Sequence, residues 1–188
     1  MNTRWLIEAL ISLIAGFWIF SKLGGLGYGI IYVMIWIDKV IFTSFIKINS
    51  YIGIDLIFIP MILVGMIEGP IGGFIFGFLV MPVLTGFLSI VSWQLTPPMQ
   101  MKYPPFLPTP DNVVYGIISA LASILWANQI PFVIIVAVCM IVKGLLLATM
   151  DIFIRQDYMY IFAYITNAVY NILLAYFLQD FFLSIVMM

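Results

Sequence analysis

The chain consists of long apolar segments separated by short polar or glycine-rich breaks. Continuous apolar runs are typical of membrane helices, whereas a transmembrane barrel would need short segments of alternating polarity. We expect seven helical segments. They cover Trp5–Phe20, Leu26–Ile46, Ile54–Ile67, the stretch from Pro70 to about Trp93, Asn112–Ala127, Pro131–Met150 and Asp157–Met188.

The segment Ile54–Ile67 is too short to cross a bilayer alone. About 14 residues reach roughly 21 Å, against a hydrocarbon core of about 30 Å. The turn Glu68-Gly69-Pro70 follows it, and Pro70 suits the first turn of a new helix. We therefore predict a broken helix pair around Gly69-Pro70, covered by other protein or by water.

The stretch Gln94–Asp111 is rich in proline and should be an extended, non-helical loop. Its aromatic residues suit a membrane interface. Two interpretations stay open: a surface loop anchored among the lipid headgroups, or a lid over a site between helices.

Composition excludes several classes of protein. Hydrophobic residues make up 65% of the 188 and charged residues only 8%, against about 25% charged in soluble domains. A soluble globular protein and a disordered chain are therefore excluded. The net charge of −1, without a basic cluster, argues against nucleic-acid binding. We expect one integral membrane domain over residues 1–188, surrounded by the lipid bilayer.

The chain has no histidine and one cysteine, Cys139. The commonest metal ligand and general base are thus absent, and Cys139 reads as a small buried apolar residue. We expect no metal site, no cofactor and no enzymatic activity.

Glycines recur every four residues in the middle of the chain, a spacing that places them on one helical face where another backbone can approach closely. The face could pack within the chain or against a partner subunit's helix. These helix-packing residues are Gly65, Gly69, Gly73 and Gly77.

The last segment carries a polar face. Tyr160, Tyr164, Asn167 and Asn171 are spaced by four, three and four residues, which places them on one side of a helix. Buried amides need partners in hydrocarbon. They either bond to neighbouring helices or line a polar cavity that receives a small ligand.

Lys143 lies in the middle of an apolar segment. A charge inside a membrane costs about 2.5–3.5 kcal/mol on insertion scales, so it indicates function or a buried partner. Snorkelling is the alternative, but the nearest segment end is roughly 12 Å away.

Residues 49–78, NSYIGIDLIFIPMILVGMIEGPIGGFIFGF, resemble the substrate-binding membrane subunits, or S-components, of energy-coupling factor (ECF) transporters. The resemblance is carried by Asp55-Leu56, Pro60, Gly69-Pro70, Gly73 and Gly77. It implies an all-α, polytopic membrane bundle with a six-helix core over residues 26–188, to which an extra N-terminal helix, 4–22, is added here.

The resemblance also implies a function. The chain would be the substrate-capture subunit of an ECF-type transporter for a small molecule such as a vitamin or metal ion, in the plasma membrane of a prokaryote. It would depend on a coupling subunit and ATPases as partners, because it has no phosphate-binding loop of its own.

The alternative is a structural or accessory subunit of a larger membrane complex. The extra helix favours it, as does the lack of the Ala-x-x-x-Ala motif with which S-components dock on the coupling subunit: Leu26–Ile46 contains no alanine. The positive-inside rule adds a conflict. With seven crossings, Arg4, Lys47, Lys102 and Arg155 share the side on which the resemblance places substrate entry, against Lys22 on the other.

We predict a ligand site between the last segment and the proline-rich loop. The polar face of the last segment forms its floor, three loop residues close it, Asp55 lies at its mouth, and Lys143 could pair with an anionic group of the ligand. The predicted ligand-binding residues are Asp55, Trp93, Gln94, Tyr103, Lys143, Tyr160, Tyr164, Asn167 and Asn171.

Overall fold

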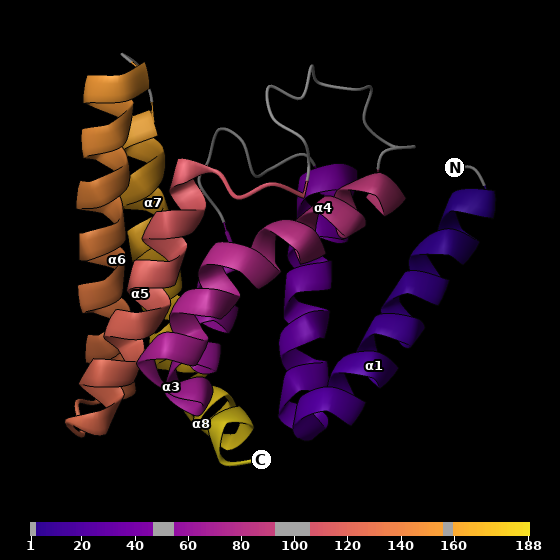
Figure 1. The fold of residues 1–188 in the computed structure, drawn as a ribbon, viewed down its shortest axis with the longest axis horizontal. Coiled ribbons are helices and arrows are strands. Elements are labelled where there is room, and N and C mark those ends of the chain that lie inside the picture. Colours follow the sequence, from indigo (N-terminus) through magenta and orange to yellow (C-terminus); the bar gives the residue numbers. More distant parts are fainter. Residues whose placement is uncertain (1–2, 47–54, 93–105, 156–159) are drawn as a thin grey trace.

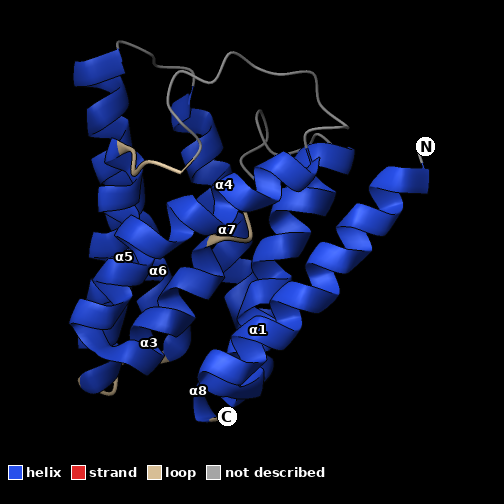
Figure 2. Cartoon of the chain, turned by 45° about the vertical axis from the view of Figure 1, so that its right-hand side comes forward, coloured by secondary structure: helices blue, strands red, loops and turns tan. Residues whose placement is uncertain are grey.

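The computed structural model describes residues 3–46, 55–92, 106–155 and 160–188. All regular secondary structure in these residues is helical (Figure 2). The expected all-α fold class is therefore confirmed.

Four helices in the described residues are long and apolar enough to cross a membrane. They are Trp5–Phe42, Phe58–Ile90, Pro110–Ala127 and Phe132–Phe153. A bent pair, Phe162–Phe177 with Gln179–Met187, raises the number to five if it counts as one span. The chain thus fits a multi-pass membrane protein.

Helix α1 (Thr3–Trp36) is a helical hairpin that continues into a π-helical stretch, η1 (Ile37–Ile46). Its backbone leaves helical geometry at Gly24 and Gly25, and Figure 1 shows the chain reversing direction at the lower end of α1. The break falls between the expected helices 4–22 and 26–46. The two arms are joined because the Tyr32 hydroxyl donates to the Ser12 carbonyl oxygen at 2.8 Å.

Helix α3 (Phe58–Ile75) contains the predicted break. Gly69 has φ 80° and ψ 178°, a conformation almost restricted to glycine, and Pro70 opens the second half. The second half continues through η2 (Phe76–Val80) into α4 (Met81–Ser92). The first half is only about 16 Å long, so it reaches about half-way through the bundle, and all its residues from Phe58 to Met66 are buried.

Replacing Gly69 by alanine should therefore weaken the fold. A Cβ at this position meets no atom within 4 Å, so the cost is conformational and should be about 1–3 kcal/mol. Thermal unfolding in detergent measures it. The neighbouring exposed Ile71 is the control, since Ile71→Ala should change stability by less than about 0.5 kcal/mol. Equal stability of the two variants would contradict the prediction.

The remaining helices are α5 (Pro110–Ala127), α6 (Phe132–Met150), η3 (Asp151–Arg155), α7 (Tyr160–Phe177) and α8 (Gln179–Met187). Helices α5, α6 and α7 lie side by side at the left of Figure 1, and α3 packs most extensively on α5. The last apolar segment is not one straight helix: the axes of α7 and α8 differ by 75° after a break at Leu178.

Glycines bring α3 and α5 into backbone contact. A Cβ on Gly65 would lie 2.0 Å from the Ser119 carbonyl oxygen, and one on Gly77 would lie 2.6 Å from the Tyr115 carbonyl carbon. Gly73 faces Gly65 across the break, with its Cβ position 2.9 Å from the Gly65 Cα. The glycines therefore serve packing within the chain, except Gly69, which shapes the turn.

Candidate functional site

The site is built around the residues that lead into α3. Asp55 Oδ1 accepts a hydrogen bond from the Ile57 amide at 2.9 Å, which satisfies a donor at the start of the helix. The Leu56 amide donates to Asp38 Oδ1 of η1 at 2.8 Å. Side-chain carboxylates thus hold this short non-helical stretch, which leads into the short first half of α3, the part before the break at Gly69.

Lys143 of α6 reaches the same place. It is about 16 Å along α6 from Phe132, and only 4% of its surface is exposed. Its Nζ lies 3.3 Å from Asp55 Oδ2 and donates to Asn167 Oδ1, also at 3.3 Å. The ion pair therefore joins two residues 88 positions apart in the chain, about half-way along the span Phe132–Phe153.

Two aromatic rings complete the surroundings of the Lys143 ammonium. The Phe58 ring centroid is 5.0 Å from Nζ, and the Tyr115 centroid is 5.5 Å away. Both distances are within the range of cation–π attraction. Phe58 is the first residue of α3, Tyr115 belongs to α5, and Asn167 belongs to α7. Three helices besides α6 therefore contribute to this environment.

Asn171 of α7 closes the network on the other side of Asp55. Its Nδ2 donates to the Asp55 carbonyl oxygen at 3.1 Å and to the Asn167 carbonyl oxygen at 3.0 Å. Asn171 is fully buried, and its Oδ1 has no hydrogen-bond partner. We call Asp38, Asp55, Lys143, Asn167 and Asn171 the polar cluster.

Asp38 and Asp151 are two further buried carboxylates. The Asp38 side chain is fully buried and lies 3.6 Å from the partly exposed Lys39 ammonium. Asp151, 1% exposed, accepts a hydrogen bond from the Tyr164 hydroxyl. Both carboxylates occur in π-helical stretches, η1 and η3, and such local widening of a helix is frequent at functional sites.

The structure brings together four of the nine predicted ligand-binding residues: Asp55, Lys143, Asn167 and Asn171. Tyr164 lies on the same helix but bonds to Asp151 instead. The prediction for Trp93, Gln94, Tyr103 and the Tyr160 side chain falls outside what the structure describes, and so does the proposed lid.

Sequence reasoning missed Asp38, Phe58 and Tyr115 as neighbours of the site. Asp38 is conspicuous in the sequence as a carboxylate within the apolar run Leu26–Ile46. The sequence does not show that its partner is the Leu56 amide. For Lys143 the sequence indicated either a function, such as binding an anionic ligand group, or a buried partner, and in the structure Lys143 is paired with Asp55.

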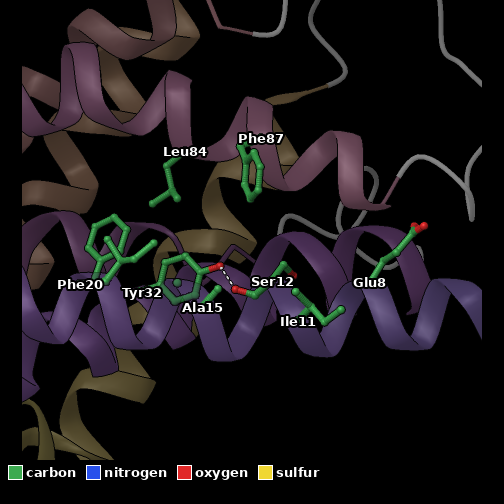
Figure 3. A pocket seen from close by; sticks show the side chains of 10 residues that line it. Glu8, Ile11, Ser12, Ala15, Phe20, Tyr32, Leu84 and Phe87 are labelled. Carbon is green, nitrogen blue, oxygen red and sulfur yellow. Dashed lines mark hydrogen bonds between the residues drawn. The ribbon is translucent and has the colours of Figure 1, made fainter.

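Two cavities lie away from the polar cluster. One of about 380 Å³ lies between the arms of α1 and α4 and presents almost only carbon (Figure 3). Its polar groups bond inward: the Ser12 hydroxyl donates to the Ala9 carbonyl oxygen and accepts from the Trp36 indole. The other, about 500 Å³, lies between the α5–α6 turn and α8.

The functional groups of the polar cluster are two carboxylates, one ammonium and two amides. Among the described residues, no group of three or more histidine, cysteine or acidic side chains could hold a metal ion. What the cluster offers is a charged pair, two amides and aromatic faces inside a helix bundle. No protein-family model, curated protein or solved structure matches the chain.

Proposed function

We propose that the protein captures a small solute inside the membrane as the substrate-binding subunit of a transport system. The observation that carries this is the largely buried Asp55–Lys143 pair, which lies where the short first half of the broken helix α3 begins. Ionisable residues within membrane spans mark substrate or ion pathways by default. Discontinuous helices that begin or end near the bilayer midplane are typical of transporter binding sites.

The resemblance of residues 49–78 to ECF S-components supports the same function. On this proposal, residues 26–188 form the six-helix core, a coupling subunit and ATPases supply energy, and the complex lies in a prokaryotic plasma membrane. Co-purification in mild detergent tests the partners. Recovery of ATPase subunits supports the proposal, and recovery of an assembly without any ATPase contradicts it.

Solute capture itself is tested by thermal unfolding of the purified protein. Water-soluble vitamins and divalent transition-metal ions are added singly, because a ligand that binds only the folded state raises its stability. At 100 times Kd the increase is about 2.7 kcal/mol. A solute that both stabilises the protein and is taken up by cells expressing it is the expected result.

Asn171→Leu should weaken solute capture. The change removes the donor to the Asp55 carbonyl oxygen and the unpartnered Oδ1, and we expect at least about tenfold weaker solute binding, or about 1.4 kcal/mol. Asn167→Leu should act in the same direction. Thr166→Val is the matched control, since Thr166 bonds only to the Phe162 carbonyl oxygen of its own helix. Normal uptake in both asparagine variants would refute the site.

A structural subunit is the second candidate, favoured by one observation. Most hydrogen-bonding groups of the polar cluster are satisfied by the chain itself, as expected of a network that fixes helix positions. In that case the asparagine variants should lower stability or complex assembly, and no solute from the screen should bind. Ligand-dependent stabilisation of the wild-type protein decides between the two functions.

A further inference from the structure

The surroundings of the Lys143 ammonium have the chemistry of a cation-binding site. Asp55 Oδ2 and Asn167 Oδ1 lie 3.3 Å from Nζ, and the rings of Phe58 and Tyr115 face it at 5.0 and 5.5 Å. A carboxylate, an amide oxygen and aromatic faces are groups that recognise a positive charge. All four come from elements other than α6, so the surrounding cage does not depend on the Lys143 backbone.

An unused acceptor lies next to this cage. Asn171 is fully buried, its Nδ2 donates toward Asp55 and Asn167, and its Oδ1 has no partner. A buried acceptor without a donor is costly and indicates a missing donor or cation rather than a missing anion. Because the Lys143 charge is already paired with Asp55, an anionic ligand would have to displace that carboxylate.

On the basis of the function proposed above, we infer that this cage binds a small monovalent cation, such as Na⁺ or a protonated primary amine, and that the Lys143 ammonium is its resident occupant. When the external cation enters, Lys143 releases one proton to solvent and its neutral amine leaves the carboxylate. The incoming cation takes the position beside Asp55. One positive charge replaces another, so the largely buried Asp55 carboxylate stays compensated.

Among the titratable groups near Lys143, Asp55 is the carboxylate that pairs with the Lys143 ammonium. Tyr115 on α5 presents its ring to Nζ. On η1, Asp38 accepts a hydrogen bond from the Leu56 amide and lies 3.6 Å from the Lys39 ammonium. Tyr164 on α7 donates to Asp151 of η3. Among the described residues, Asp55 is therefore the carboxylate to which the exchange is coupled.

The test uses the purified full-length protein in weakly buffered detergent solution. Sodium chloride and methylammonium chloride are added separately, with tetraethylammonium chloride at equal ionic strength as the bulky control. We expect release of one proton per cation bound and an apparent affinity that rises up to about tenfold per pH unit. The salt that gives both proton release and pH-dependent affinity identifies the ligand: sodium chloride indicates a metal cation, and methylammonium chloride indicates an amine.

Three variants of the cage and one control variant separate cation exchange from an unspecific salt effect. Lys143→Arg keeps a permanent charge and should neither bind the cation nor release protons. Lys143→Ala should bind the cation without proton release and should be stabilised by it, whereas Lys143→Ala combined with Asp55→Asn should lose this stabilisation. Lys22→Ala, an exposed lysine outside the cage, should behave as wild type.

Absence of proton release from the wild-type protein with both cations would overturn the inference, and so would undiminished cation binding in the double variant. The wild-type measurement decides even if Lys143→Ala does not fold. Cation binding does not require transport, so the two proposals fail separately. Cation binding without uptake of any solute would contradict only the transport function, and solute uptake without cation binding would contradict only the cation site.

Discussion

Lys143→Met is expected to destabilise the protein by about 3–5 kcal/mol. The change removes the cation that pairs with the Asp55 carboxylate, and only 21% of the Asp55 side chain is exposed to solvent. In other proteins, loss of one partner of a buried ion pair costs about 3–5 kcal/mol. Denaturant unfolding in mixed micelles measures the effect. The cost arises mainly from the uncompensated charge, because Met fills most of the volume of the lysine stem.

The double variant Asp55→Leu with Lys143→Met should recover most of the lost stability. With both charges removed, no desolvated ion remains, and replacement of a buried pair by apolar residues is often neutral or stabilising by about 1–4 kcal/mol. Lys22→Met serves as the control for the substitution itself, because Lys22 is exposed. If Lys143→Met is as mild as Lys22→Met, the buried pair does not support the fold.

Gly65→Ala and Gly77→Ala are expected to separate α3 from α5. The new Cβ would lie 2.0 Å from the Ser119 carbonyl oxygen in the first case and 2.6–2.7 Å from backbone atoms of Tyr115 and Gly116 in the second. Backbone atoms cannot rotate aside as a side chain can, so the helices must move. We expect a loss of about 1–3 kcal/mol for each variant, and a larger loss for Gly77→Leu.

Gly144→Ala is the matched control for these glycines. Gly144 lies inside α6, and a Cβ there meets no atom within 4 Å. Its replacement should be neutral or stabilising by about 0.5–1 kcal/mol, because alanine favours the helix. Thermal unfolding of the three alanine variants in one detergent compares them directly. A destabilised Gly144→Ala together with unchanged Gly65→Ala and Gly77→Ala would contradict the packing observed between α3 and α5.

The two largest predictions concern the same part of the molecule. The Ser119 hydroxyl donates to the Met61 carbonyl oxygen at 2.7 Å and fixes α5 on the first half of α3, the half that begins next to Asp55. Glycine contacts therefore set the position of this short helix, and the ion pair holds its entry. A shift of α3 against α5 should also disturb the Asp55–Lys143 pair. Combining Gly65→Ala with Lys143→Met should then cost less than the sum of the two single changes.

The sequence determined the features that depend on near neighbours along the chain. Uninterrupted apolar runs predict helices because a backbone in lipid must satisfy its own hydrogen bonds. The break at Gly69-Pro70 follows from a residue that tolerates φ 80° beside one that lacks an amide hydrogen. The shared face of Tyr164, Asn167 and Asn171 follows from helical periodicity alone. Lys143, Asn167 and Asn171 of the polar cluster were named on such grounds, whereas Asp55 was named through the family resemblance.

Only the tertiary structure decided which of these residues meet. The partner of Lys143 is 88 residues away along the chain, and the Asp55 carbonyl oxygen is bonded by an amide 116 residues away. Asp38 joins the cluster through a backbone amide, which no side-chain pattern reveals. The 75° bend between α7 and α8 interrupts an apolar run that periodicity treats as continuous. Propensity and periodicity act over a few residues, whereas the packing of α3, α6 and α7 against one another places a buried charge beside its counter-ion.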